Sequence, residues 1–181
     1  FALGQHDLKR LLAYHSIENI GIICMGLGVG LCGLSLGRPG IALLGLAGGL
    51  LHVLNHAIFK ALLFLGAGVV IHVSGSRELD RMGGLVRVMP RTGLFFLVGA
   101  VAICGLPPMN GFVSELLVYL GLFRQVMGES RSAAVLAALA IPALAVVGGL
   151  AVACFVKVFG VVFLGSARQP LAVDAHEPGW P

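Results

Sequence analysis

Charged side chains are scarce in this 181-residue sequence. Asp, Glu, Lys and Arg together make up 11% of the residues, against about 25% in an ordinary soluble domain. Hydrophobic residues make up 58%, and the mean hydropathy is +1.00. So few ionisable groups cannot keep a domain of this size in water, which excludes a soluble enzyme, a nucleic-acid-binding protein and a disordered tail. The composition predicts a polytopic membrane protein with the lipid bilayer as its surroundings.

Residues of the kind that hold cofactors are also few. The four cysteines lie within apolar segments, with no C-x-x-C pair and no histidine at metal-ligand spacing beside them. Such cysteines usually pack between helices as small apolar side chains. The four are Cys24, Cys32, Cys104 and Cys154. We therefore expect no haem, zinc or iron–sulfur site, and no cofactor of the chain's own.

The sequence has no recognisable leader segment and does not begin with Met. It starts in the middle of a pattern at Phe1 and ends at Pro181, shortly after a membrane-length apolar run. We expect a fragment of a longer subunit. In this interpretation residues 1–166 form a transmembrane domain, and residues 167–181 form a polar tail or the start of the next connector.

Long apolar runs are abundant. A bilayer core of about 30 Å is crossed by roughly 20 helical residues. Residues 16–35, 41–73 and 133–164 each form a run of at least that length, and Pro142 predicts a kink in the last one. The 27 glycines permit close contact between helices in lipid.

Two shorter apolar runs, residues 93–106 and 111–127, flank Pro107 and Pro108. Proline ends or breaks a helix, so these runs predict a discontinuous helix or a tightly turned pair. The predicted fold class is therefore all-α: a transmembrane helical bundle of about five spans with one discontinuous helix.

The basic residues between the runs predict an orientation. If all five runs cross the membrane, one side carries Arg38 and Arg168. The other side then carries Lys9, Arg10, Arg77, Arg81, Arg87, Arg91, Arg124 and Arg131. The positive-inside rule places this second side in the cytoplasm.

The second long run contains three ionisable residues at intervals of four. His52, His56 and Lys60 would lie about 40° apart around an α-helix and about 6 Å apart along it. One water can bridge neighbours at that separation, and histidine exchanges protons near neutral pH. The stripe predicts a proton relay, with histidines simply satisfied inside the core as the alternative. A zinc site is not expected, because a third ligand is missing.

Glu115 lies four residues, about one helical turn, after the break formed by residues 105–111. Backbone groups freed by a broken helix need protein or water as partners, and interrupted apolar segments mark ion sites in transporters. Glu115 is thus a second candidate, with an interfacial turn as the alternative. Two accessory candidates remain. Glu18 either lies at the interface or pairs with a cation from another helix, and Lys157 either takes part in transport or anchors its helix.

Four segments of the sequence resemble, in order, one known family. They are residues 7–16 (DLKRLLAYHS), 52–65 (HVLNHAIFKALLFL), 77–90 with an MGGL motif, and 105–115 (GLPPMNGFVSE). Together they resemble the antiporter-like membrane subunits of respiratory complex I, of multisubunit cation/proton antiporters and of membrane-bound NiFe hydrogenases. Residues 16–21 and 105–115 are most similar to the hydrogenase branch, of the formate hydrogenlyase and hydrogenase-4 type.

The resemblance implies a proton-translocating subunit built from two inverted five-helix repeats, of which this chain holds the second. By this resemblance Lys9, His52, His56 and Lys60 match the family's central polar axis, and Glu115 matches the charged residue of its broken helix. The redox centres would then belong to partners: other membrane subunits and a peripheral hydrogenase or dehydrogenase arm at the cell inner membrane. The alternatives are a cation/proton antiporter without a redox partner, or a membrane anchor that does not conduct.

Overall fold

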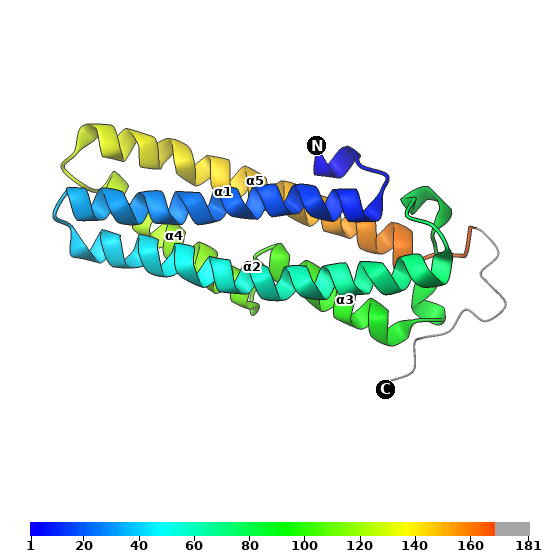
Figure 1. The fold of residues 1–181 in the computed structure, drawn as a ribbon. Coiled ribbons are helices and arrows are strands. Elements are labelled where there is room, and N and C mark those ends of the chain that lie inside the picture. The colour runs from blue at the N-terminus through cyan, green and yellow to red at the C-terminus, as the bar shows by residue number, and fades with distance from the viewer. Residues whose placement is uncertain (169–181) are drawn as a thin grey trace.

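The computed structural model describes residues 1–168, which form a bundle of five α-helices (Figure 1). These are α1 (Leu8–Ser35), α2 (Pro39–Ser74), α3 (Pro90–Ile103), α4 (Asn110–Val126) and α5 (Arg131–Phe163). Three short 3-10 helices accompany them: η1 (Ala2–Gly4), η2 (Leu79–Arg81) and η3 (Leu85–Arg87). This confirms the all-α class. Residues 169–181, which include most of the predicted polar tail, lie outside the described residues.

Three of the helices are long and apolar enough to cross a membrane. They are α1, α2 and α5, while α3 is a shorter apolar helix. In Figure 1, α1 and α2 run antiparallel side by side along the full length of the bundle, and α5 runs the same length beside α1. The bundle is therefore organised as a multi-pass membrane protein.

The discontinuous helix is also confirmed. α3 begins at Pro90 at the end of the bundle where α2 finishes, and it stops near the middle at Ile103. α4 begins at Asn110 and continues to the opposite end (Figure 1). The two short helices thus share one passage along the bundle, interrupted by the segment that contains Pro107-Pro108.

This shared passage corrects the predicted sides of three arginines. Arg124 lies in the last turn of α4 and Arg131 begins α5, at the end of the bundle where Arg38 precedes α2 (Figure 1). Arg38 lies 4.0 Å from the carboxylate of Glu129, which belongs to the connection between α4 and α5. The prediction that Arg124 and Arg131 lie on the side of Lys9 was wrong, because it counted α3 and α4 as two separate crossings.

The predicted side of Arg168 was wrong for the same reason. Arg168 follows α5 and donates to the backbone carbonyl of Leu79 at 3.4 Å, in the connection that follows α2. It therefore lies at the end of the bundle opposite to Arg38.

The start of α1 also differs from the prediction. The helix begins at Leu8 rather than near Ser16, because the Asp7 side chain accepts a hydrogen bond from the backbone N–H of Arg10 at 2.8 Å. This is a typical N-cap. Leu8, Leu11 and Leu12 are fully buried, so the polar residues among them occupy only the outer face of an amphipathic first turn.

Small residues bring α1 and α2 into backbone contact at the end remote from Asp7. A Cβ atom on Gly26 would lie 2.8 Å from the Cα of Gly49. A Cβ on Gly30 would lie 2.6 Å from Leu46 Cγ, and Gly45 faces the Gly30 backbone. We call this contact the glycine seam, and define it as Gly26, Gly30, Gly33, Ala42, Gly45 and Gly49. It confirms that glycine permits close helix packing here.

Candidate functional site

Polar side chains gather where α1, α2 and α4 meet at the helix break, and all of them except the exposed Asn110 are buried. We call this group the polar cluster. Its members are His15, Asn19, His52, Asn55, Asn110 and Ser114. Three of them, Asn19, His52 and Ser114, have no exposed surface. Polar groups this deeply buried need hydrogen-bond partners, and the cluster supplies them from three helices.

His52 is the centre of the cluster. Its Nε2 lies 3.0 Å from Oδ1 of Asn19 on α1, and its Nδ1 lies 2.9 Å from Oγ of Ser114 on α4. Asn19 in turn donates from Nδ2 to the backbone carbonyl of His15 at 2.8 Å. Both ring nitrogens of His52 are therefore within hydrogen-bond distance of side chains on other helices. In this way His52, on α2, links α1 and α4.

The helix break joins the cluster through two asparagines. Asn55 donates from Nδ2 to the backbone carbonyl of Asn110 at 2.8 Å and to Ser114 Oγ at 3.1 Å. Asn110 returns a hydrogen bond from its Nδ2 to Asn55 Oδ1 at 3.0 Å. Because Asn110 is the first residue of α4, these bonds fasten the start of that helix to the middle of α2.

Lys60 lies two helical turns beyond His52 on α2. It is 6% exposed, and its ammonium donates to the backbone carbonyl of Leu12 on α1. The ammonium also lies 5.6 Å from the centre of the Phe64 ring. A cation held among apolar helices with so few partners is costly to bury, so a structural anchoring role explains it poorly.

The Glu115 carboxylate points back toward the helix break. A Cβ atom on Gly105 would lie 2.6 Å from Glu115 Oε2, so the carboxylate fills the space beside this residue. Gly105 has a φ of +62°, in the left-handed region that favours glycine. Glu115 is also the residue after Ser114, whose hydroxyl contacts His52.

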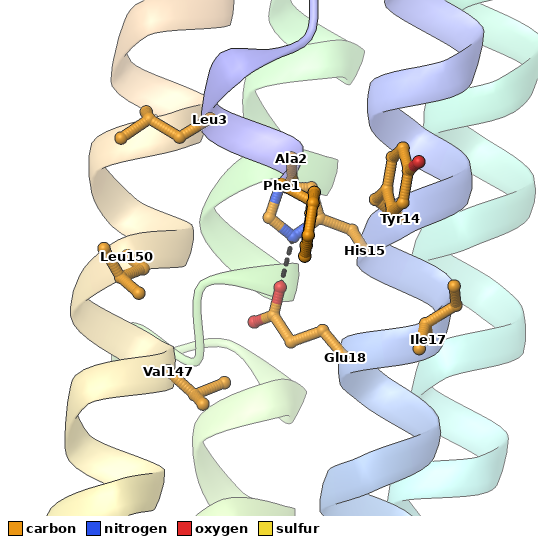
Figure 2. A pocket seen from close by; sticks show the side chains of 9 residues that line it. All are labelled: Phe1, Ala2, Leu3, Tyr14, His15, Ile17, Glu18, Val147 and Leu150. Carbon is orange, nitrogen blue, oxygen red and sulfur yellow. Dashed lines mark hydrogen bonds and ion pairs between the residues drawn. The ribbon is translucent and has the colours of Figure 1, made fainter.

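A second ionisable pair lies on α1, at the edge of the bundle. His15 Nδ1 is 2.5 Å from Glu18 Oε2. Figure 2 shows both side chains reaching from α1 into a cleft toward α5, where Val147 and Leu150 line the opposite wall. Of the two alternatives given for Glu18, an interfacial position or a cation from another helix, the structure shows neither directly: the partner of its carboxylate is His15, one turn earlier on the same helix.

The remaining candidates are less closely connected. His56 is half-buried, and its Nε2 has no hydrogen-bond partner within residues 1–168. Lys9, in the first turn of α1, makes no side-chain hydrogen bond or ion pair in that part of the chain. Lys157 donates to the backbone carbonyls of Leu3 at 2.8 Å and Gln5 at 3.4 Å, so it ties the chain's start to α5.

Sequence reasoning missed the buried uncharged members of the cluster. Asn19, Asn55 and Ser114 carry no charge, so a search for ionisable groups in apolar runs passes over them. A signal was nevertheless present, since Asn19 follows His15 by four residues and Asn55 follows His52 by three. These spacings put each pair on one helix face, and a search for any polar residue within the runs would have found them.

The cluster is suited to proton exchange rather than to metal binding. Among residues 1–168, no group of three His, Cys, Asp or Glu side chains could hold a metal ion. Cys104 and Cys154 are buried in the apolar core, while Cys24 is exposed. What the site offers is imidazole, carboxylate, ammonium and hydroxyl groups enclosed by apolar helices.

Residues 1–141 match the model of the family described as the NADH:quinone oxidoreductase/Mrp antiporter transmembrane family. This match covers well over half of the chain. The chain belongs to this family. The resemblance predicted from the four segments is confirmed, and the all-helical bundle with its broken helix is the fold that the family membership implies.

Two relatives from Escherichia coli (strain K12) are similar over almost the whole chain. Formate hydrogenlyase subunit 3 is 46% identical over 97% of this chain and 29% of its own length. Hydrogenase-4 component B is 45% identical over 98% of this chain and 26% of its own length. The chain thus spans less than a third of the curated relatives it matches, and the likeness to the hydrogenase branch is confirmed.

A solved structure is similar in three dimensions as well. The structure of the Mrp complex from Dietzia sp. DQ12-45-1b contains a chain that matches with a TM-score of 0.69 and 28% identity. The match covers 92% of this chain and 27% of that one. All three relatives are named as parts of larger assemblies, and this chain is accordingly related to subunits of multisubunit membrane complexes.

Proposed function

We propose that this chain is the second repeat of a proton-translocating membrane subunit in a redox-driven complex of the hydrogenase-4 and formate hydrogenlyase type. Protons pass between the buried ammonium of Lys60, the histidines of α2 and the Glu115 carboxylate, with bound water bridging the gaps. The redox reaction takes place in partner subunits, including a peripheral hydrogenase or dehydrogenase arm. The host membrane is the cell inner membrane.

The observation that carries this proposal is the environment of Lys60. A lysine that is 6% exposed, between helices α1 and α2, has one backbone carbonyl as its hydrogen-bond acceptor. Ionisable residues inside membrane segments are rare and serve ion or proton pathways by default. His52 and Glu115 extend the path from Lys60 to the helix break, where backbone groups are free to hold water.

The test uses the full-length subunit in its assembled complex, reconstituted in vesicles. Lys60→Ala and Glu115→Gln each remove one member of the path, and proton translocation is measured per electron transferred. We expect both variants to translocate at least about tenfold fewer protons, since a positioned proton-transfer group contributes about 10²–10⁴ to its step. Lys157→Ala is the matched control, because that lysine also donates to backbone carbonyls but lies at the bundle edge. Unchanged translocation in both test variants contradicts the proposal.

The structural likeness to an Mrp complex favours one alternative, a cation/proton antiporter that works without a redox partner. It is distinguished by imposing a Na⁺ or K⁺ gradient on the same vesicles without an electron donor. Proton movement driven by the gradient and lost in Lys60→Ala supports the antiporter. Proton movement that requires electron transfer supports the redox-driven subunit.

A non-conducting membrane anchor is the third alternative. Neutralising His52, His56, Lys60 and Glu115 together separates it from the other two. If the complex assembles with full redox turnover and the same proton movement as the unmodified complex, the chain is an anchor. If turnover continues without proton movement, the ionisable groups conduct.

A further inference from the structure

The amide of Asn19 fixes which nitrogen of His52 carries a proton. Asn19 Nδ2 donates to the backbone carbonyl of His15 at 2.8 Å. A carbonyl only accepts hydrogen bonds, so a reversed amide would place two acceptors against each other. Asn19 Oδ1 must then face His52 Nε2, at 3.0 Å. Because Oδ1 also only accepts, His52 carries a hydrogen on Nε2 for as long as this bond exists.

The hydroxyl of Ser114 controls the other nitrogen. Its Oγ lies 2.9 Å from His52 Nδ1 and 2.9 Å from the backbone carbonyl of Gly111. It accepts a hydrogen bond from Asn55 Nδ2 at 3.1 Å, and the Asn55 amide is oriented by its bond to the Asn110 carbonyl. Ser114 has a single hydrogen to donate. That hydrogen points either to His52 or to a backbone carbonyl at the start of α4, of which Gly111 at 2.9 Å is nearer than Asn110 at 3.5 Å.

Two patterns of hydrogen bonds satisfy both His52 and Ser114. When His52 is neutral, Nδ1 accepts the hydrogen of Ser114. When His52 carries two protons, Nδ1 donates to Ser114 Oγ, and the hydroxyl turns its hydrogen to the Gly111 carbonyl. Neither arrangement leaves His52 or Ser114 with an unsatisfied polar group, which would be costly in a buried site. Rotation of one hydroxyl is sufficient to pass between them.

We propose that Asn19 and Ser114 are positioning residues that confine proton exchange at His52 to Nδ1, on the α4 side beside the helix break. This rests on the proposed proton-translocating function. A proton arrives when Ser114 gives its hydrogen to Nδ1 and its oxygen takes a proton from a hydronium ion in the break. His52 gains one proton and one positive charge, and the hydronium ion loses both and becomes water. Exchange on the α1 side is closed, because Asn19 holds the Nε2 hydrogen.

The first measurement follows proton translocation per electron in vesicles that contain the full assembled complex. Ser114→Ala removes the hydroxyl, and we expect translocation to fall about tenfold or more. Ser114→Thr keeps the hydroxyl, and we expect it to retain translocation within about twofold. Ser35→Ala is the matched control, because Ser35 donates to a carbonyl three residues earlier as Ser114 does, without a histidine beside it.

Asn19→Leu removes the amide that holds Nε2. We expect it to lower translocation as Ser114→Ala does, while Gln125→Leu has no effect. Gln125 is the matched control because it is also a buried carboxamide that links two segments, through Cys32 Sγ and the Ala133 carbonyl, and it has no imidazole partner. Wild-type translocation in both Ser114→Ala and Asn19→Leu overturns the inference.

The second measurement observes the tautomer directly, first in the subunit with Asn19 and Ser114 unaltered and then in Asn19→Leu. The full-length subunit is labelled with ¹⁵N in its histidine rings, and His52 is identified by the signal missing in His52→Gln. We expect neutral His52 to be protonated on Nε2, and Asn19→Leu to produce a mixture of both tautomers. A neutral His52 protonated on Nδ1 in the unmodified subunit overturns the inference.

Failure of the proposed function is distinguishable from failure of this inference. If His52→Gln itself leaves translocation unchanged, the relay fails. If His52→Gln abolishes translocation but Ser114→Ala and Asn19→Leu do not, the relay stands and the positioning role is overturned.

Discussion

The two ends of the α1–α2 pair are held together by opposite means. At one end, the glycine seam brings the two backbones into contact with almost no side chain between them. From the middle of the pair toward the other end, Asn19 and His52 bond to each other between the same helices, and Lys60 reaches across to α1. The first end stabilises by close packing, whereas the second accepts the cost of buried polar groups. The difference separates the part of the pair that holds the bundle together from the part suited to moving protons.

Breaking the glycine seam should have the largest effect on stability. Gly26→Val places a branched side chain where a Cβ alone would lie 2.8 Å from the Gly49 Cα. We expect the free energy of unfolding of the full-length subunit to fall by about 3 kcal/mol, the upper range for overpacking a core. Denaturation of the purified subunit in detergent measures this free energy. Gly28→Val is the control two residues away, because a Cβ there meets nothing within 4 Å. Equal losses in both variants would contradict the seam.

Disturbing the helix break should have the next largest effect. Gly105→Ala adds a Cβ 2.6 Å from Glu115 Oε2, at a residue with φ +62°. We expect a loss of about 1–3 kcal/mol from the left-handed backbone and the displaced carboxylate, together with reduced proton translocation. Gly75→Ala separates the two causes, because Gly75 has φ +67° but nothing within 4 Å of its Cβ position. Gly75→Ala should lose stability and keep translocation. If it also loses translocation, displacement of Glu115 is not the cause.

Removing the buried charge of Lys60 should affect function but not stability, and so distinguish the two parts of the α1–α2 pair. Lys60→Met keeps the length of the side chain and removes the ammonium from a site that is 6% exposed. We expect the free energy of unfolding to stay within about 1 kcal/mol of the unmodified value or to rise, since apolar replacements of buried charges are often neutral or stabilising. Proton translocation should be lost. The free energy of unfolding and proton translocation are measured on the same preparation. A large loss of stability would mean that Lys60 serves to hold the helices together.

The smallest effect is expected for the lysine at the bundle edge. Lys157→Ala removes the hydrogen bonds to the carbonyls of Leu3 and Gln5. We expect a loss of about 1 kcal/mol or less, because these bonds are only partly shielded from solvent, and no change in protons moved per electron. A loss of translocation as large as that of Lys60→Met would place Lys157 in the proton path.

Local sequence signals predicted the helices well where the signal was strong. The predicted run of residues 41–73 became α2 (Pro39–Ser74), and the run 111–127 became α4 (Asn110–Val126). The start of α1 was missed because Leu8, Leu11 and Leu12 are buried on one face while Lys9 and Arg10 lie on the outer side. Average hydropathy conceals such an amphipathic turn, and the capping role of Asp7 gives the better indication.

The site was predicted only as far as charge could indicate it. His52, Lys60 and Glu115 stand out in apolar runs, but the spacing of His52, His56 and Lys60 predicted that water bridges them along one stripe of α2. In the structure both His52 nitrogens instead bond to other helices, to Asn19 and Ser114. Helical spacing describes one helix at a time, so it cannot indicate which neighbouring helix supplies a partner.

The scarcity and placement of charged residues by themselves determined the class, the helices and the ionisable candidates, because burying a charge in lipid is costly wherever it lies in the fold. Only the tertiary structure decided that α3 and α4 share one passage, that Glu18 pairs with His15, and that three buried uncharged residues, Asn19, Asn55 and Ser114, complete the site. These depend on contacts between residues as far apart as His52 and Ser114. Such contacts arise from the packing of whole helices rather than from any local pattern.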